Sequence, residues 1–204
     1  MVKQEGQISI DPVARWAERQ DWIRPELEES AQGAIHSTFE LMGSAGHQVK
    51  SFLHGDWLHE PLHAAVTDIP VGAWTATMVF DALAALTGRE ELDSAADATL
   101  WVGLAGAAAA AVTGMTDWSE IEEAKTRRVG AVHALLNIAA TGLFATSCIL
   151  RKSRKSRPGG RALATLGYAM VSVSAHLGGT LVYEHGMGLR APLAAPVADP
   201  EEGI

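Results

Sequence analysis

Two histidines, His133 and His176, lie inside long apolar stretches that contain no Asp, Glu, Lys or Arg. Histidines that face each other from two helices can ligate a haem or a transition metal, and Asn137, one helical turn after His133, would then serve as a hydrogen-bond partner of the ligand. A neutral histidine can also form a hydrogen bond between helices with no cofactor present. The pair therefore has two interpretations, a haem site and a structural hydrogen bond, and the residues favour the structural one.

A candidate metal site involves histidines at the ends of the apolar stretches. His63 precedes the first stretch, His185 follows the last, and Asp68 adjoins the first. If the stretches are helices of alternating direction, these three residues lie at the same end, as a metal transporter or a membrane hydrolase would require. His59 and His63 also have the i, i+4 spacing of a zinc-binding pair, but Pro61 between them fits better as the first residue of a helix.

Other catalytic motifs are absent from the sequence. It contains no GxSxG, Walker, dinucleotide or deaminase motif, and Gly178-Gly179 inside an apolar stretch indicates close helix packing rather than a phosphate loop. Cys148 is the only cysteine, so neither an intrachain disulfide nor a CxxC-type site can form within the chain. We therefore expect that the chain is not an enzyme.

Four apolar stretches would position these side chains. Each is close to the ~20 residues that a helix needs to cross a bilayer. A soluble helix ordinarily carries a charged face, and none of the four stretches has one, although an alanine-rich soluble bundle is the alternative. The sequence therefore predicts an all-α fold, specifically a four-helix transmembrane bundle. The stretches are residues 69–86, 98–115, 129–150 and 162–183, with Asp81 as their single acidic or basic residue.

The net charge of −8 is carried mainly by residues outside these stretches. Residues 1–60 are predicted to be an extramembrane segment, in which residues 26–53 mix charged and apolar side chains as an amphipathic helix does. Gly43 and Gly46 are candidate breaks in that helix. Residues 61–190 form the predicted four-span domain. Residues 191–204, rich in Pro, Ala and acidic residues, are expected to be disordered.

The connector from Arg151 to Arg161 is strongly basic. In a soluble protein such a run would suggest a nucleic-acid patch, but between two apolar spans it predicts a short loop that stays in the cytoplasm. Alternation of the spans then places both chain ends and the connector of residues 116–128 outside. We therefore expect a multi-pass protein of the plasma membrane with the lipid bilayer, and no nucleic acid, as its partner.

Asp81 lies toward the predicted inner end of the first stretch, away from the histidines. A charged residue at this depth ordinarily has an ionic partner, and Arg89, Arg151 and Arg161 lie at the same end. The expected role of Asp81 is therefore a structural ion pair, with a proton relay as the alternative.

Small residues at every fourth position of the second stretch predict close helix packing. They are Gly106, Ala110 and Gly114. The same pattern also serves contacts between chains, so it is compatible with a homo-oligomer as well as with a monomer.

Three stretches make the chain resemble a family of uncharacterised bacterial four-span membrane proteins known as domain of unknown function 2231. They are FLHGDWLHEPLHAAVTDIPVGAWTATMVFDALA from Phe52, TGMTDWSEIEEAKTRRVGAVHALLN from Thr113 and HLGGTLVYEHGMGL from His176. The chain departs from the family with HEPLHA in place of GHPLHP, and with Thr180 in place of a histidine. The resemblance implies structural roles at Asp68, Trp74, Asp81, Asp117, Trp118, Asn137, Gly178 and Gly179.

Some relatives in this family look fused to a Rieske iron–sulfur domain, which implies a redox setting for the membrane part. The resemblance to a bacterial membrane family implies a bacterial plasma membrane. The leading prediction is a membrane anchor or subunit without an activity of its own. The alternative is a redox subunit that binds haem b through His133 and His176, or a metal, in association with a Rieske-type partner. A membrane or redox protein partner is compatible with both.

Overall fold

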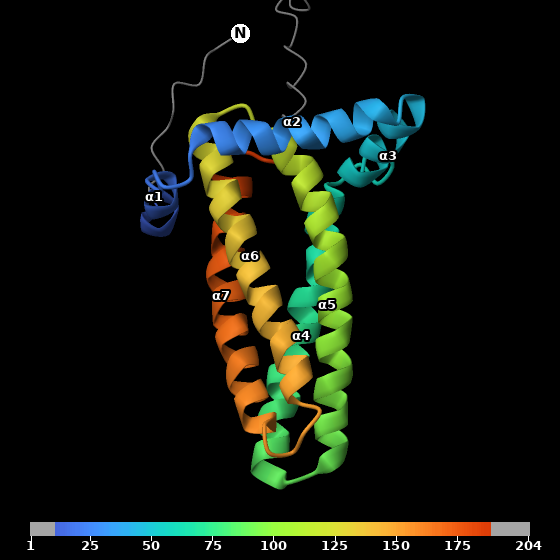
Figure 1. Cartoon of the computed structure of the whole chain (residues 1–204), viewed down its shortest axis with the longest axis vertical. Helices are drawn as coiled ribbons and strands as arrows, with labels where there is room; N and C mark the ends of the chain where they lie inside the picture. The colour runs from blue at the N-terminus through green and yellow to red at the C-terminus, as the bar shows by residue number, and fades with distance from the viewer. Residues whose placement is uncertain (1–10, 189–204) are drawn as a thin grey trace, which may run out of the picture.

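The computed structural model describes residues 11–188, and within them it contains seven helices and no strands. The prediction of an all-α fold is therefore confirmed. Short α1 to α3 precede four long helices, which run alternately up and down (Figure 1). The helices are α1 (Pro12–Glu18), α2 (Pro25–Leu41), α3 (Ser44–His54), α4 (Leu62–Thr87), α5 (Glu90–Ser119), α6 (Ala124–Leu150) and α7 (Arg157–Tyr183).

The four long helices form two pairs. α4 packs along α5 and α6 packs along α7, while contacts between the pairs, from α5 to α6 and from α4 to α7, are fewer. Each predicted apolar stretch lies within one of these helices, in the order of the sequence. We call the end where α2 lies the α2 end, and the opposite end, where the connector from α6 to α7 lies, the Arg151 end (Figure 1).

By length and apolarity, three helices among the described residues can cross a membrane, rather than the predicted four. They are α4, α5 and α6, and α7 is not among them. α7 has the same length as α6, 27 residues. However, Ser172, Ser174, His176 and Thr180 interrupt its apolar residues and lower its mean hydropathy.

Small residues of α5 allow α4 to approach closely. A methyl group added to Gly106 would lie 2.8 Å from Pro70 Cδ and from Ile69 Cγ2, which is closer than packed carbon atoms come. Gly103 likewise leaves space for the indole of Trp74, whose ring stacks on Phe144 of α6 with a centroid distance of 4.0 Å. Pro70 lies inside α4 without ending it. This packing follows from the small residues that the sequence places along α5.

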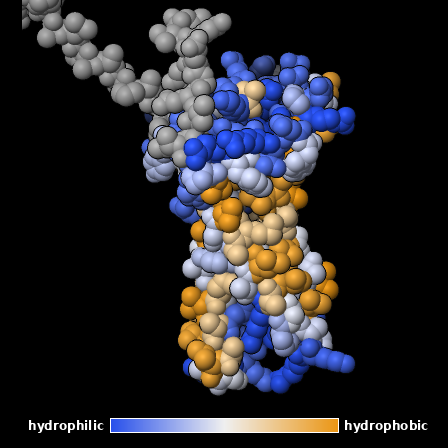
Figure 2. All heavy atoms as spheres, turned by 90° about the vertical axis from the view of Figure 1, so that its left-hand side faces the viewer, coloured by the Kyte–Doolittle hydropathy of each residue, from blue (hydrophilic) through white to orange (hydrophobic). Residues whose placement is uncertain are grey.

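The long helices carry small polar residues inside and large apolar residues outside. Thr77, Ser147 and Ser174 have no exposed surface, whereas Leu86 is 84% exposed and Ile138 is 66% exposed. On the face shown in Figure 2, apolar surface predominates along the shaft of the molecule below a hydrophilic cap. A soluble bundle would have the reverse distribution, because water favours a polar exterior. The surface of the long helices is therefore suited to lipid.

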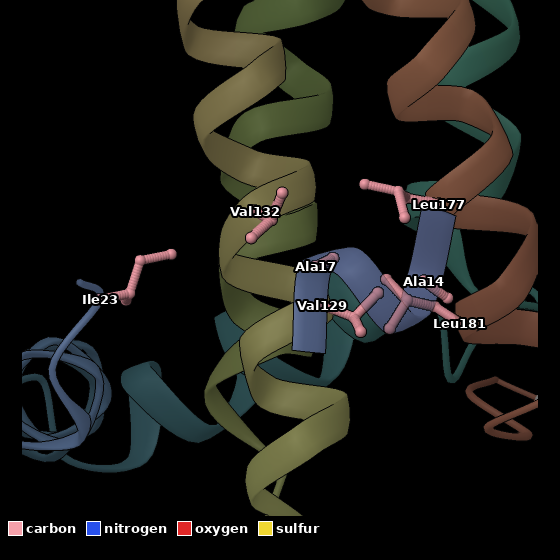
Figure 3. Packing of buried hydrophobic residues seen from close by; sticks show 7 residues of the cluster. All are labelled: Ala14, Ala17, Ile23, Val129, Val132, Leu177 and Leu181. Carbon is pink, nitrogen blue, oxygen red and sulfur yellow. The ribbon is translucent and has the colours of Figure 1, made fainter. Parts of the chain in front are cut away.

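α1 packs against one side of the α6–α7 pair. The carboxylate of Asp11 begins this helix by accepting hydrogen bonds from the backbone N–H groups of Val13 and Ala14, at 2.8 and 2.9 Å. The apolar cluster that seats α1 is shown in Figure 3 and consists of Ala14, Ala17, Ile23, Val129, Val132, Leu177 and Leu181.

The predicted amphipathic segment of residues 26–53 is two helices, α2 and α3. They are separated at Gly43, whose positive φ of 57° favours glycine. α2 lies across the α2-end termini of α5 and α6, and α3 folds back beneath its far end (Figure 1). The predicted boundaries at residues 60 and 190 stay predictions, and the tail of residues 191–204 lies outside the described residues.

Candidate functional site

Asp81 pairs with arginines from the other helix pair. Arg151 Nη1 donates to Asp81 Oδ1 at 2.8 Å, and Arg161 Nε lies 3.3 Å from the same oxygen. Both Asp81 and Arg151 are buried, with 7% and 5% of their surface exposed. Arg89, the third partner that the sequence offered, instead lies 3.5 Å from Glu91. The paired charges join α4 to α6 and α7.

Further ion pairs extend this contact across α5 and α7. Arg157 Nη2 donates to Asp97 Oδ2 at 2.7 Å, and Arg161 Nη2 donates to Asp93 Oδ1 at 2.5 Å. Arg151 Nη1 also lies 3.3 Å from Asp97 Oδ1. These three ion pairs join the two helix pairs at the Arg151 end. We call this set the ionic cluster, and it consists of Asp81, Asp93, Asp97, Arg151, Arg157 and Arg161.

The two helix pairs enclose an open cavity of about 2220 Å³ at the α2 end. All four long helices line it, and the apolar residues Leu27, Ala31 and Ile35 of α2 form its roof. Trp74, which stacks on Phe144, marks its deep end. At 1.5 Å per residue, the cavity follows α4 for about 16 Å between His63 and Trp74. The cavity is therefore deep enough to hold a molecule of lipid-like length.

His63 and His133 face each other across the cavity. Their ring centroids are 6.4 Å apart in an edge-to-face arrangement. His63 Nδ1 donates to Ala110 O at 2.9 Å, and His133 Nδ1 donates to Ser174 O at 2.8 Å, since a carbonyl can only accept. Asn137 Nδ2 then donates to His133 Nε2 at 3.1 Å. Both ring nitrogens of His133 are therefore already used in hydrogen bonds.

His176 lies elsewhere, so the structure does not bring the predicted haem pair together. Its side chain is 51% exposed, and its Nε2 lies 2.7 Å from Asp11 Oδ2 at the start of α1. The hydrogen bond from the backbone N–H of Ala14 lowers the pKa of Asp11 most strongly, burial opposes this shift, and the hydrogen bond from His176 lowers the pKa further. His176 thus fastens α1 to α7. The partner of His133 in space is His63, which the sequence placed in a different site.

The predicted metal residues do not form a ligand set. His185 Nδ1 donates to Thr126 Oγ1 at 2.8 Å, because that hydroxyl itself donates to Glu123. His63 and His185 both line the cavity without a contact between them. Within residues 11–188, no group of three or more His, Cys, Asp or Glu side chains is placed to hold a metal ion.

Asp68 also lines the cavity. It lies on α4 with an exposed side chain, and the structure records no hydrogen bond or ion pair for it within residues 11–188. Gly178 lies beside the ring of His133, where an added methyl group would be 3.2 Å from Cε1, while Gly179 faces open space. Asp68 is therefore left available to a ligand, as is the buried Nε2 of His185, which has no hydrogen-bond partner among the described residues.

The contacts that hold α2 against the ends of α5 and α6 were not predicted from the sequence. Arg128 Nε donates to Glu28 Oε1 at 2.7 Å, and its Nη1 donates to Gln20 O at 2.7 Å. Gln32 Nε2 donates to Trp118 O at 3.0 Å. Glu28 is 3% exposed and lies one hundred positions before Arg128. A local pattern could not reveal such a distant pair.

Asp117 and Trp118 shape the connector between α5 and α6. The indole Nε1 of Trp118 donates to Arg127 O at 2.9 Å, and a methyl group on Gly130 would lie 2.6 Å from Trp118 Cδ1. Asp117 Oδ1 accepts a 2.7 Å hydrogen bond from His54 Nδ1, which joins α3 to α5. This bond, with the charge of Asp117, raises the pKa of His54 above its usual value of 6.5, while partial burial opposes the rise.

The contact between α3 and α5 should depend on pH. Below pH 6.5, His54 is protonated whether α3 is docked or free, so its pair with Asp117 contributes fully. As the pH rises through the raised pKa, docked His54 loses its proton and this contribution disappears. Glu120 strengthens the effect and Lys50 weakens it. We expect less protection of residues 44–54 from hydrogen exchange at pH 9 than at pH 6, after correction for intrinsic rates.

Asp117→Asn is the control for this pH effect. It keeps the shape of the side chain and removes the charge, so the pH dependence of protection in α3 should disappear. Protection that stays constant in the unaltered chain, or that changes equally in the variant, would contradict the assignment to His54.

Comparison with known proteins identifies a family. A family model described as predicted membrane protein (DUF2231) matches residues 59–191, which include all four long helices and most of the cavity wall. No curated protein and no solved structure matches the chain.

Proposed function

We propose that this chain, which belongs to the DUF2231 family of predicted membrane proteins, crosses the bacterial plasma membrane four times as a helical bundle. In that membrane it serves as a non-catalytic anchor or subunit. One observation carries the membrane part of this proposal. The long helices keep paired charges inside, such as Asp81 with Arg151, and turn Leu86 and Ile138 outward. Only a lipid environment stabilises that arrangement over the length of a helix.

A fourth crossing by α7 agrees with where its polar residues lie. Ser174 and Thr180 are buried in the molecule, whereas Leu166 and Val173 are about half exposed. Ser174 Oγ also donates to the carbonyl of His133 in α6. Of the four polar residues that lower the mean hydropathy of α7, Ser174 and Thr180 therefore face protein. His176 is exposed but contacts Asp11 beside α1, and exposed Ser172 donates to the carbonyl of Tyr168 within α7. A helix of this kind can cross a bilayer within a bundle.

The basic connector supports a cytoplasmic Arg151 end. Lys152, Arg154 and Lys155 are exposed there, and short basic loops remain on the cytoplasmic side. The α2 end, with α2 and α3, would then be external.

The non-catalytic role rests on how the ionisable groups between the helices are used. Those of the ionic cluster are paired with one another, and both ring nitrogens of His133 are engaged. Groups held in this way stabilise a bundle and are not available to a substrate. α2 and α3 offer an extramembrane surface through which a subunit could contact a larger complex.

Single cysteines test the topology. In a Cys148→Ser background, we expect Glu40→Cys and Glu184→Cys to react with a membrane-impermeant maleimide on intact cells, and Ser153→Cys to react only after permeabilisation. Glu184→Cys reports on α7, since it lies on the same side as Glu40 only if α7 crosses. Labelling of Glu184→Cys together with Ser153→Cys would contradict four crossings. Labelling of Ser153→Cys alone on intact cells would show that the Arg151 end is external and the α2 end is cytoplasmic.

The role as a subunit has its own test. The tagged full chain, extracted from its native membranes in mild detergent, should migrate with a second protein in a fixed ratio and show no Soret band on reduction. Charge reversals on α2, Glu26→Lys with Glu40→Lys, should release the partner, whereas Lys152→Glu at the opposite end should not. A chain that always migrates alone, or a haem band lost in His133→Ala, would overturn the proposal.

A further inference from the structure

The charged residues that line the cavity are all acidic. Among the described residues no lysine or arginine contributes to the lining, while Asp and Glu side chains occur from its rim to its middle. Some are neutralised from outside, as Glu28 is by Arg128 and Glu120 is by Lys50. Asp68, Glu60 and Glu122 are exposed to the cavity or its rim, and none of them forms an ion pair within residues 11–188. The cavity therefore presents uncompensated negative charge.

Apolar side chains form the rest of the wall. The roof residues of α2, with Leu104, Leu135 and Val171, face the same space as these carboxylates. Leu27 in the roof remains 53% exposed, although α2 is clamped to α6 by Glu28. An exposed apolar surface inside a cavity gains stability when an apolar molecule covers it.

Residues of both α4 and α7 line the cavity, and these two helices have fewer contacts with each other than each has within its own pair. These helices are joined by the hydrogen bond between Thr75 Oγ1 and Tyr168 Oη at 2.8 Å. Asp68 lies two helical turns nearer the α2 end than Thr75, where residues of both helices line the open cavity. Asp68 has no ion pair within residues 11–188, so a cation in the cavity is attracted to this carboxylate.

We propose that this cavity binds a lipophilic organic cation, which enters from the bilayer between α4 and α7 and places its charge beside Asp68. An anionic lipid would be repelled by the carboxylates, and a neutral lipid would cover the apolar wall but leave Asp68 unpaired. A cation with an apolar body satisfies both features of the cavity. The entry route rests on the proposed crossing of the membrane, whereas the binding itself does not.

Two ions of the same shape and opposite charge provide the test. Binding of tetraphenylphosphonium and of tetraphenylborate to the purified full chain in nanodiscs would be measured by equilibrium dialysis against empty nanodiscs. We expect saturable binding of the cation at one site per chain and none of the anion. Asp68→Asn should weaken binding of the cation by roughly tenfold or more, because it removes the opposite charge. Asp68→Glu should restore it, and Glu91→Gln at the Arg151 end should leave it unchanged.

A second variant tests binding in the cavity without changing Asp68. Ala175→Trp places a large side chain on the α7 wall of the cavity and should abolish binding of the cation, while size-exclusion elution and helix content stay unchanged. Equal binding of both ions, or unchanged binding in Asp68→Asn and Ala175→Trp, would overturn the proposal. Since binding is measured on the purified chain, such a failure leaves the cysteine mapping untouched, and a failed mapping leaves the binding result valid.

Discussion

Replacing Arg151 with alanine is expected to lower the free energy of unfolding by about 3–5 kcal/mol, the usual cost of removing one partner of a buried ion pair. Arg151 Nη1 lies 2.8 Å from Asp81 Oδ1. The variant leaves the buried carboxylate of Asp81 with Arg161 at 3.3 Å as its remaining partner. It also removes the link from α6 to Asp97. The measurement is unfolding of the purified chain in mixed detergent micelles with increasing dodecyl sulfate.

Arg154→Ala is the matched control for this variant. Arg154 lies three positions further in the same connector and pairs with Glu90, but both side chains are mostly exposed. Its removal should cost no more than about 1 kcal/mol. The double variant Asp81→Leu with Arg151→Met should recover most of the stability, since it removes the isolated charge together with its partner. Similar losses for Arg151→Ala and Arg154→Ala would show that the ionic cluster does not hold the helix pairs together.

Replacing Glu28 with alanine is expected to release α2 from the ends of α5 and α6. The change leaves the guanidinium groups of Arg127 and Arg128, each 8% exposed, without their buried carboxylate. The local cost should again be about 3–5 kcal/mol. Residues 25–41 should lose protection from hydrogen exchange and become accessible to proteases, while protection within α4 to α7 is kept.

Glu29→Ala is the neighbouring control for the release of α2. Glu29 lies 3.5 Å from Arg127 Nη2, but its side chain is 64% exposed, so its loss should change stability by no more than about 1 kcal/mol. Glu28→Gln should have an intermediate effect, because the amide oxygen still accepts a hydrogen bond. Equal exchange in α2 for Glu28→Ala and Glu29→Ala would disprove the clamp.

The extent and order of the helices could be predicted because apolar stretches without charges are unmistakable in a sequence. The ionic partners of Asp81 could also be narrowed down, since few arginines lie at the same end of the helices. The rotation of each helix about its own axis could not be predicted from the sequence. α5 and α6 are apolar on all sides, so no stripe indicates which residues face inward. For that reason the sequence paired His133 with His176, whereas His133 faces His63 and His176 faces Asp11.

The position of α2 was equally hidden. An amphipathic helix is ordinarily expected to bury its apolar side, but here Glu28 and Gln32 form the buried contacts and the apolar side lines the cavity. The contacts that decide this arrangement join residues far apart in the chain, such as Glu28 with Arg128. Close helix packing by small residues was easier to predict, because a repeat at every fourth position is visible in the sequence itself. Gly106 is an example, since it lies where α4 approaches α5 closely.

The restriction of the ionic cluster to one end gives the molecule a mechanical consequence. At the Arg151 end the two helix pairs are joined by ion pairs, whereas at the α2 end they are joined by the short connector from α5 to α6 and by α2, which lies across both helices. In the proposed four-crossing arrangement, lateral pressure from the lipid acts on the contacts of α2 at one end and on the ionic cluster at the other. Lipids that change the lateral pressure near the α2 end would therefore change the width of the cavity without altering the ionic cluster.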